Sequence, residues 1–150
     1  MHKARQAANH VLLVEDDQAD AHITQWVFKD ISQNRHQGIH LEHCETGESA
    51  LSRLEACLEN SQPLPHLILL DLNMPRMDGF TFLQRIKAHQ QLRLIPVVVL
   101  TTSNAQSDVR QSYALGAAGY IVKSTSMDAF TRHMQQLTTY WFELVKRTDT

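Results

Sequence analysis

Acidic side chains follow two short apolar runs of the sequence, and their types and spacing point directly to a chemistry. Glu15 and Asp16 come directly after the run at 11–14, and Asp71 comes directly after the run at 67–70. Three carboxylates gathered in one cleft repel one another unless a cation lies among them. Mg2+ prefers a few carboxylates together with water and phosphate oxygens. We therefore expect these three acids to form a magnesium site.

Two further side chains extend this set toward phosphoryl transfer. Thr101 follows the apolar run at 95–100, and Lys123 follows the run at 119–122. A lysine is a mobile point charge that can pair with a carboxylate or a phosphoryl oxygen. A carboxylate can act as a nucleophile and form an aspartyl phosphate, while the metal and the lysine neutralise the developing charge. The set indicates phosphoryl transfer to an aspartate.

The apolar runs that precede these residues have strand length, and helical patterns alternate with them. The four runs are nearly continuous in apolar character, as buried parallel strands are, and residues 39–44 form a weaker fifth candidate. Five strands alternating with five helical segments predict an α/β fold. The expected architecture is a flavodoxin-like, doubly wound, five-stranded parallel sheet of order 2-1-3-4-5 with five helices. Ligands of such sheets bind beyond the carboxyl ends of the strands, where all these polar residues fall.

Length and composition exclude several other classes of protein. The 150 residues suffice for one domain, and 43% hydrophobic with 20% charged residues is typical of a globular chain. A net charge of -2 gives no basic excess for nucleic acid, and two cysteines cannot form a disulfide framework. Neither a signal-peptide core nor a membrane-spanning run is present, so we expect a cytoplasmic protein without membrane contact. The expected organisation is a tail at 1–9, a domain at 10–147 and a tail at 148–150.

Four blocks of this sequence resemble the receiver domain of response regulators in two-component signalling, in the family's order and spacing. They are VLLVEDD at 11–17, LLDLNMPRMDG at 69–79, PVVVLTT at 96–102 and GYIVK at 119–123. The resemblance implies that Asp71 accepts a phosphoryl group from a sensor histidine kinase. It also implies that Mg2+ is held by Glu15, Asp16, Asp71 and the backbone carbonyl of Asn73.

The same resemblance implies roles for residues around the phosphoryl group. Thr101, Thr102 and Lys123 would contact its oxygens, with Thr102 acting through its backbone amide. Thr101 and Tyr120 would move together as the switch on activation. Ser103, like Asn73, matches a position that tunes the rate of dephosphorylation. The chain would then be a phosphoacceptor signalling protein, with self-phosphoryl transfer and autodephosphorylation as its only catalysis.

Some features depart from the family's common pattern or narrow the match. Glu15 replaces the commoner aspartate, and Ser124 replaces the proline that often follows the lysine in a cis peptide. A cis bond before serine costs roughly 3 kcal/mol, which leaves the geometry of this peptide open. Ser124, the loop at 63–65 and a long last helix with aromatic residues at 140–142 resemble the single-domain regulators of phytochrome histidine kinases.

The first and last helices carry specific expectations about which residues they bury. In the first helix the apolar stripe includes Trp26, and Phe28 falls off it. The last helix is expected to run from about 126 to 146, or ~30 Å. Its predicted stripe comprises Phe130, Leu137, Trp141 and Leu144. Tyr140 and Phe142 fall partly outside that stripe and, with Trp141, are candidates for a homodimer interface through the fourth helix, fifth strand and fifth helix.

Other functions fit the sequence less well. A receiver-like interaction module that is not phosphorylated would lack one of the acids, the threonine or the lysine, and all are present. An aspartate-nucleophile phosphatase usually needs a second acid two residues on, where Asn73 stands. A flavin site would require a phosphate-cradling loop after the first strand, and that loop is acidic. The histidines at 36, 40 and 43 with Cys44 lack zinc-ligand spacing.

Overall fold

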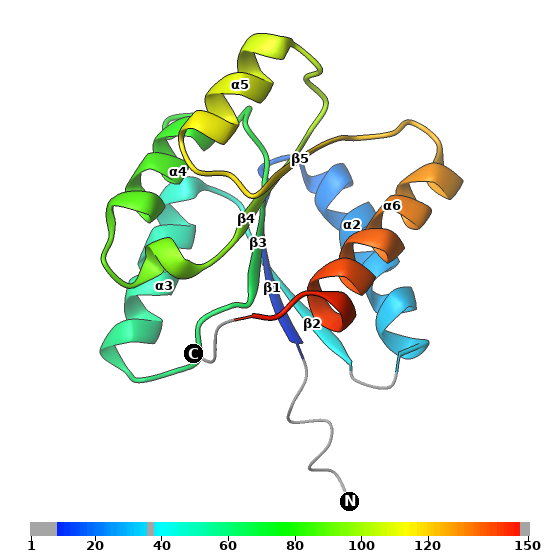
Figure 1. Cartoon of the computed structure of the whole chain (residues 1–150), viewed down its shortest axis with the longest axis horizontal. Coiled ribbons are helices and arrows are strands. Elements are labelled where there is room, and N and C mark those ends of the chain that lie inside the picture. The colour runs from blue at the N-terminus through cyan, green and yellow to red at the C-terminus, as the bar shows by residue number, and fades with distance from the viewer. Residues whose placement is uncertain (1–8, 36–37, 148–150) are drawn as a thin grey trace, which may run out of the picture.

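The computed structural model describes residues 9–35 and 38–147 and contains one five-stranded parallel sheet of order β2-β1-β3-β4-β5 (Figure 1). The strands are β1 (Asn9–Val14), β2 (Ile39–Cys44), β3 (Leu67–Leu70), β4 (Val97–Thr101) and β5 (Gly119–Val122). The helices are α2 (Gln18–Gln33), α3 (Gly47–Glu59), α4 (Gly79–Ala88), η1 (Leu92–Leu94), α5 (Gln106–Ala114), α6 (Met127–Thr139) and η2 (Tyr140–Leu144). The predicted flavodoxin-like architecture is confirmed.

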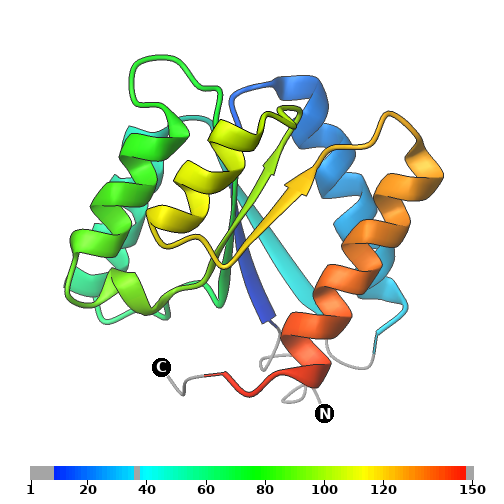
Figure 2. The ribbon, with the colours of Figure 1, turned by 45° about the horizontal axis from the view of Figure 1, so that its top comes forward.

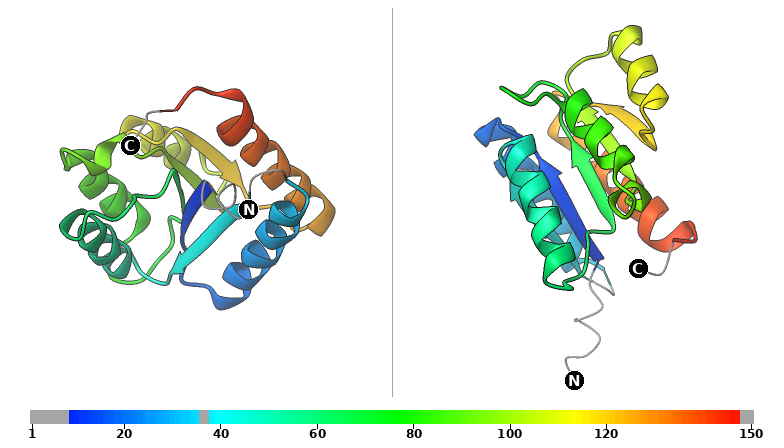
Figure 3. Two further views of the ribbon diagram at one scale, coloured as in Figure 1. Left: turned by 90° about the horizontal axis from the view of Figure 1, so that it is seen from below. Right: turned by 90° about the vertical axis from the view of Figure 1, so that its left-hand side faces the viewer.

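Helices cover both faces of the sheet, which explains the continuous apolar runs in β1, β3 and β4 (Figure 3). The run at 119–122 was expected to be buried as well, but β5 lies at the edge of the sheet and its residues are half-buried or exposed. Leu12 and Val14 of β1 face a core shared with α3 and α4. Val11 and Leu13 face a second core shared with α2 and α6. Because successive strand residues point to opposite faces, each of residues 11–14 packs into one of the two cores. The polar residues are left for the strand ends.

Two aspartates begin helices next to the carboxyl ends of the strands. The side chain of Asp17 accepts a hydrogen bond from the amide of Asp20 (2.9 Å), and Asp78 accepts one from the amide of Thr81 (2.9 Å). Asp78 therefore caps the amino end of α4. Gly79 follows it, and a Cβ there would lie 2.6 Å from the carbonyl oxygen of Asp71. Glycine is required because α4 begins against the backbone of the acid-bearing loop.

The buried face of α2 differs from the prediction. Trp26 is 63% exposed and Phe28 is 1% exposed, so the expected positions of the two aromatic residues were reversed. The buried residues of this helix are Ala21, Thr24, Val27, Phe28 and Ile31. Thr24 can join this stripe because its hydroxyl donates to the carbonyl oxygen of Asp20 (2.9 Å). Val27 and Ile31 of the predicted stripe are buried, but counting only large apolar residues shifted that stripe toward Trp26 and away from Thr24 and Phe28.

The last helix is shorter than predicted and changes its winding. Regular α-helix ends at Thr139, and residues 140–144 form a π-helical turn closed by a bond from the Val145 amide to the Tyr140 carbonyl (3.0 Å). A π turn holds more residues than an α turn, which rotates the following side chains about the axis. Phe142 is consequently 9% exposed and Leu144 is 73% exposed, the opposite of the expected pattern. The chain then turns away from the helix axis (Figure 2).

Several smaller expectations can be placed in the structure. Asn9, expected in the N-terminal tail, begins β1, and residues 1–8 and 148–150 lie outside the described residues. No peptide bond among the described residues is cis, so the bond between Lys123 and Ser124 is trans. His36 also lies outside the described part of the chain.

Within the described part of the chain, no helix combines the length and apolar character needed to cross a membrane.

Candidate functional site

Backbone hydrogen bonds hold the site residues at the carboxyl edge of the sheet. The amide of Glu15 donates to the carbonyl of Cys44 (3.1 Å), and the amide of Asp71 donates to that of Val14 (3.1 Å). The amide of Lys123 donates to the carbonyl of Thr101 (2.7 Å). The ladder thus extends one residue past β1, β3 and β5. Side chains that are up to 108 residues apart in sequence are fixed at one edge as a result.

The three predicted acids do converge. One carboxylate oxygen from each of Glu15, Asp16 and Asp71 lies within 4.8 Å of the others, and this is the metal-capable cluster found within residues 9–35 and 38–147. Glu15 and Asp71 are buried, and Asp16 is half-buried. Burial, opposed in part by a hydrogen bond from Lys123, raises the pKa of Glu15 to about 7. A hard divalent cation would favour the ionised form, so the donor set fits such an ion.

Lys123 pairs with two carboxylates, one from the predicted acid cluster and one from α2. Its Nζ donates to Glu15 Oε1 (2.6 Å) and to Asp20 Oδ2 (2.9 Å). Among the ion pairs of the described residues, none joins Lys123 to Asp71. Burial alone would lower the pKa of Lys123, but the bonds to Glu15 and Asp20 raise it above its ordinary value. Lys123 is therefore held as a charged ammonium beside the acids.

Thr101 carries a hydroxyl suited to a ligand. It is the last residue of β4 and fully buried, and its Oγ1 has no hydrogen-bond partner in the described structure. A buried donor without a partner costs about 1–3 kcal/mol. The strand end thus holds a buried polar group that no side chain or backbone group of the described residues satisfies.

Tyr120 connects β5 to the loop that follows β4. Its hydroxyl donates to the backbone carbonyl of Ser103 (2.8 Å), while Ser103 Oγ donates to Asp108 Oδ2 (2.6 Å). Burial raises the pKa of Tyr120 above its ordinary value.

Two neighbours expected at the site, Asn73 and Thr102, have exposed side chains in the loops after β3 and β4. Asp108 had not been singled out from the sequence.

His43 is a second residue that sequence reasoning did not place at the site. Its Nε2 donates to the backbone carbonyl of Glu15 across 2.7 Å and so holds the turn that carries the acids. His40, His43 and Cys44 form no metal-capable cluster among the described residues. The usable signal was that His43 lies near the carboxyl end of β2, next to β1.

Comparison with known proteins assigns this arrangement to a family. Residues 11–135 match the model of the response regulator receiver domain. The chain belongs to the response regulator receiver family. The match includes β2 to β5, most of β1 and the acids of the site, so the resemblance seen in the sequence is confirmed.

Two relatives, Rcp1 and RcpA, are similar to this chain over most of its length. Response regulator Rcp1 of Synechocystis sp. (strain ATCC 27184 / PCC 6803 / Kazusa) is 40% identical over 136 residues, which cover 90% of each chain. The phosphorylated cyanobacterial phytochrome response regulator RcpA superposes with a TM-score of 0.85 at 30% identity, over 95% of this receiver and 100% of RcpA. The Mn2+-bound form of Rcp1 gives 0.81 at 34% identity, over 94% and 99% of the two chains.

Proposed function

We propose that this receiver takes a phosphoryl group from a phosphohistidine of a sensor histidine kinase onto Asp71. The observation that carries the proposal is the convergence of three carboxylates within 4.8 Å, next to a charged lysine and a buried hydroxyl without a partner. That constellation supplies a nucleophile, charge neutralisation and a hydrogen-bond donor at one edge of the sheet.

The ion proposed for the acid cluster is Mg2+. Glu15, Asp16 and Asp71 would hold it, with the backbone carbonyl of Asn73 as a further ligand. When bound, Mg2+ neutralises charge on the transferred group and on the acids around it. Support comes from the all-oxygen donor set and from the Mn2+-bound form of the relative Rcp1. Mg2+ binds such sets through one or two carboxylates, waters and phosphate oxygens.

The residues of this chain would divide the transfer step among them. A carboxylate oxygen of Asp71 attacks phosphorus, the bond between phosphorus and the donor's imidazole nitrogen breaks, and the imidazole leaves with the bonding electron pair. Lys123 would exchange a carboxylate partner for a phosphoryl oxygen. Thr101 Oγ1 would donate to another phosphoryl oxygen. The backbone amide of Thr102 would also donate to an oxygen of the phosphoryl group. In the present structure Lys123 is bonded to Glu15, and the hydroxyl of Thr101 has no hydrogen-bond partner among the described residues.

Activation would be transmitted through Thr101 and Tyr120. Movement of Thr101 toward the phosphoryl group opens space near β4, which the Tyr120 ring can enter. The ring would then leave its bond to the Ser103 carbonyl (2.8 Å), and the loop after β4 would change with it. Asn73 and Ser103 would set the rate at which the phosphoryl group is hydrolysed. Asn73 cannot act as a general acid, so turnover on free phosphate monoesters is not expected.

The proposed partner is a phytochrome histidine kinase in the cytoplasm. This rests on the likeness to RcpA, a phytochrome response regulator, and to Rcp1. We further propose that output uses protein contacts, including a homodimer through α5, β5 and α6. Strand β5 ends the sheet, and an open groove beside it is lined by Val122, Leu137 and Tyr140, among others. Of the aromatic candidates, Tyr140 is exposed, Trp141 is half-buried and Phe142 is buried, so Tyr140 has the strongest support as an interface residue.

Intact-mass spectrometry tests the phosphoryl transfer. The wild-type chain, treated with acetyl phosphate and Mg2+, should gain one labile phosphoryl group. Asp71→Asn should gain none, whereas Asp30→Asn, which removes an exposed aspartate of α2 outside the site, should behave as wild type. An unchanged yield in Asp71→Asn would refute the assignment of the acceptor.

A further inference from the structure

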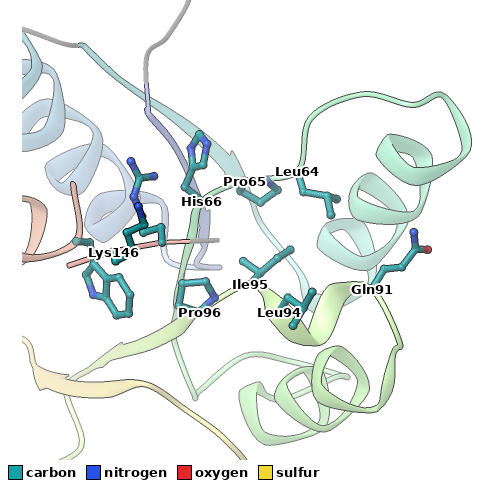
Figure 4. A pocket seen from close by; sticks show the side chains of 10 residues that line it. Leu64, Pro65, His66, Gln91, Leu94, Ile95, Pro96 and Lys146 are labelled. Carbon is teal, nitrogen blue, oxygen red and sulfur yellow. The ribbon is translucent and has the colours of Figure 1, made fainter. Parts of the chain in front are cut away.

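A cavity of about 190 Å³ lies at the edge of the sheet opposite the acids. It is formed by the segments that lead into β3 and β4 and by the chain after η2 (Figure 4). His66 directly precedes β3 and Pro96 directly precedes β4, which places the cavity at the amino ends of the parallel strands. None of the residues proposed for phosphoryl transfer lines it.

The walls of this cavity are mainly flat and apolar. They are provided by Pro65, Leu94, Ile95, Pro96 and Trp141. Leu94 is exposed although it is a large aliphatic residue, and Trp141 is half-buried. An apolar protein cavity of about 150 Å³ is enough to hold benzene. The space here therefore suits a single ring with a small substituent.

The charged groups of the cavity all have the same sign. Lys146 and Arg147 line it together with His66, and no acidic residue of the described part of the chain does. The guanidinium carbon of Arg147 lies 5.0 Å from the centre of the Phe142 ring, which fixes that side chain. Neither Lys146 nor Arg147 forms an ion pair with a carboxylate of residues 9–35 or 38–147. Burial and the nearby positive charge of Arg147 lower the pKa of His66, as expected where the potential is positive.

We propose that this cavity binds a small aromatic monocarboxylate, with the ring against Trp141 and the prolines and the carboxylate at Lys146 and Arg147. The apolar walls would contact the ring. Lys146 and Arg147, which pair with no carboxylate of the described residues, would bind the negative charge. This site is separate from phosphoryl transfer, because its residues lie at the other end of the strands. Its existence does not depend on Asp71 as the acceptor.

Nuclear magnetic resonance of the indole group provides a direct test. The chain has two tryptophans, and Trp26→Phe removes the exposed one from α2, leaving Trp141 as the single indole signal. Benzoate is the probe, with benzamide as the neutral analogue of the same shape and acetate as the carboxylate without a ring. We expect a saturable shift of the Trp141 indole signal with benzoate, and much weaker effects with benzamide or acetate.

Substitution of the cations tests the origin of the selectivity. Lys146→Gln combined with Arg147→Gln should weaken benzoate binding roughly tenfold, the loss expected for a hydrogen bond to a charged group. Arg132→Gln, which removes an exposed arginine of α6 outside the cavity, should leave benzoate binding unchanged. Circular dichroism of each variant checks that the fold is retained.

Four outcomes would overturn the proposal. One is the absence of a saturable shift with benzoate. Another is equal affinity for benzamide, which would show that the cavity does not select an anion. A third is unchanged benzoate affinity in the variant that lacks both cations. Dimerisation that benzoate or the double substitution abolishes would instead assign the cavity to a second copy of the chain.

Discussion

The ammonium nitrogen of Lys123 lies 2.9 Å from the carboxylate of Asp20, a residue of the first turn of α2. Lys123 is thus shared between Asp20 and Glu15 before any phosphoryl group arrives. These two bonds use two of the three donors of the ammonium group and fix where its nitrogen lies. Asp20 therefore competes with the incoming group for the position of the lysine.

Removal of this competitor should accelerate phosphorylation. Asp20 is partly exposed, and such ion pairs contribute about 0.2–1 kcal/mol, so Asp20→Ala should raise the rate of phosphoryl uptake roughly two- to fivefold. The measurement is the time course of adduct formation with acetyl phosphate by intact mass. Asp30→Ala, in the same helix, serves as the matched control. A slower uptake in Asp20→Ala would mean that Asp20 positions Lys123 and does not compete for it.

The hydroxyl of Thr101 should lower the free energy of unfolding and increase the rate of phosphoryl uptake. Because its buried hydroxyl has no partner, Thr101→Val should raise the free energy of unfolding by about 1 kcal/mol while slowing phosphoryl uptake. Thr138→Val is the contrasting control, since the hydroxyl of Thr138 donates to the Met134 carbonyl (2.9 Å), and its loss should not stabilise the fold. Urea unfolding of the metal-free proteins compares the three chains. Destabilisation by Thr101→Val would show that the hydroxyl is satisfied in solution.

Mg2+ affinity should depend on pH through Glu15. Burial raises the pKa of this carboxyl to about 7, so a proton competes with the cation below that value. Glu15 affects the stability of the metal-free fold in the opposite direction. Its contribution to the free energy of unfolding is fully present below the pKa of this carboxyl in the unfolded chain and is lost as the pH rises through about 7. Calorimetric titration with Mg2+ should show weaker binding at pH 6 than at pH 8. Equal affinity at both values would contradict the raised pKa.

The amino edge of the sheet should lose stability in mild acid. The amide of His10 donates to Nδ1 of His66 (2.9 Å), which requires that nitrogen to be unprotonated. Burial lowers the pKa of both imidazoles; His40 also acts on His10, and Arg147 on His66, while Glu42 opposes the shift of His10. The contribution of these two histidines to the free energy of unfolding is therefore fully present above about pH 6.5 and decreases as the pH falls below that value.

His66→Asn tests this pH effect, because the Asn oxygen can accept the same hydrogen bond without titrating. The free energy of unfolding should fall less between pH 7 and pH 5.5 in this variant than in the wild type. His22, which is exposed on α2, offers the matched control in His22→Asn. Identical pH profiles for wild type and His66→Asn would rule out His66 as the titrating group.

The fold and the acids could be predicted because both depend on local patterns. Continuous apolar runs predicted buried parallel strands, and the polar residue after each run predicted one shared edge. The register changes within helices could not be predicted in this way. Thr24 is buried because its hydroxyl bonds to its own helix, and Phe142 is buried because the chain makes a π turn. Neither feature leaves a hydrophobic period in the sequence.

The partners of the site residues were also beyond local patterns. Lys123 and Asp20 are 103 residues apart, and His43 reaches Glu15 across 28 residues. Sequence periodicity places each residue at a strand end or in a helix turn. It does not determine which of several neighbouring acids a flexible lysine contacts, because that choice depends on three-dimensional distances of a few ångströms.

The most direct test of the central claim locates the phosphoryl group in the sequence. Borohydride reduces an aspartyl phosphate to homoserine, and peptide sequencing by mass spectrometry then reads its position. After treatment with acetyl phosphate and Mg2+, homoserine should appear at position 71 and at no other aspartate. Homoserine at position 16, or its absence throughout the chain, would contradict the proposed role of Asp71.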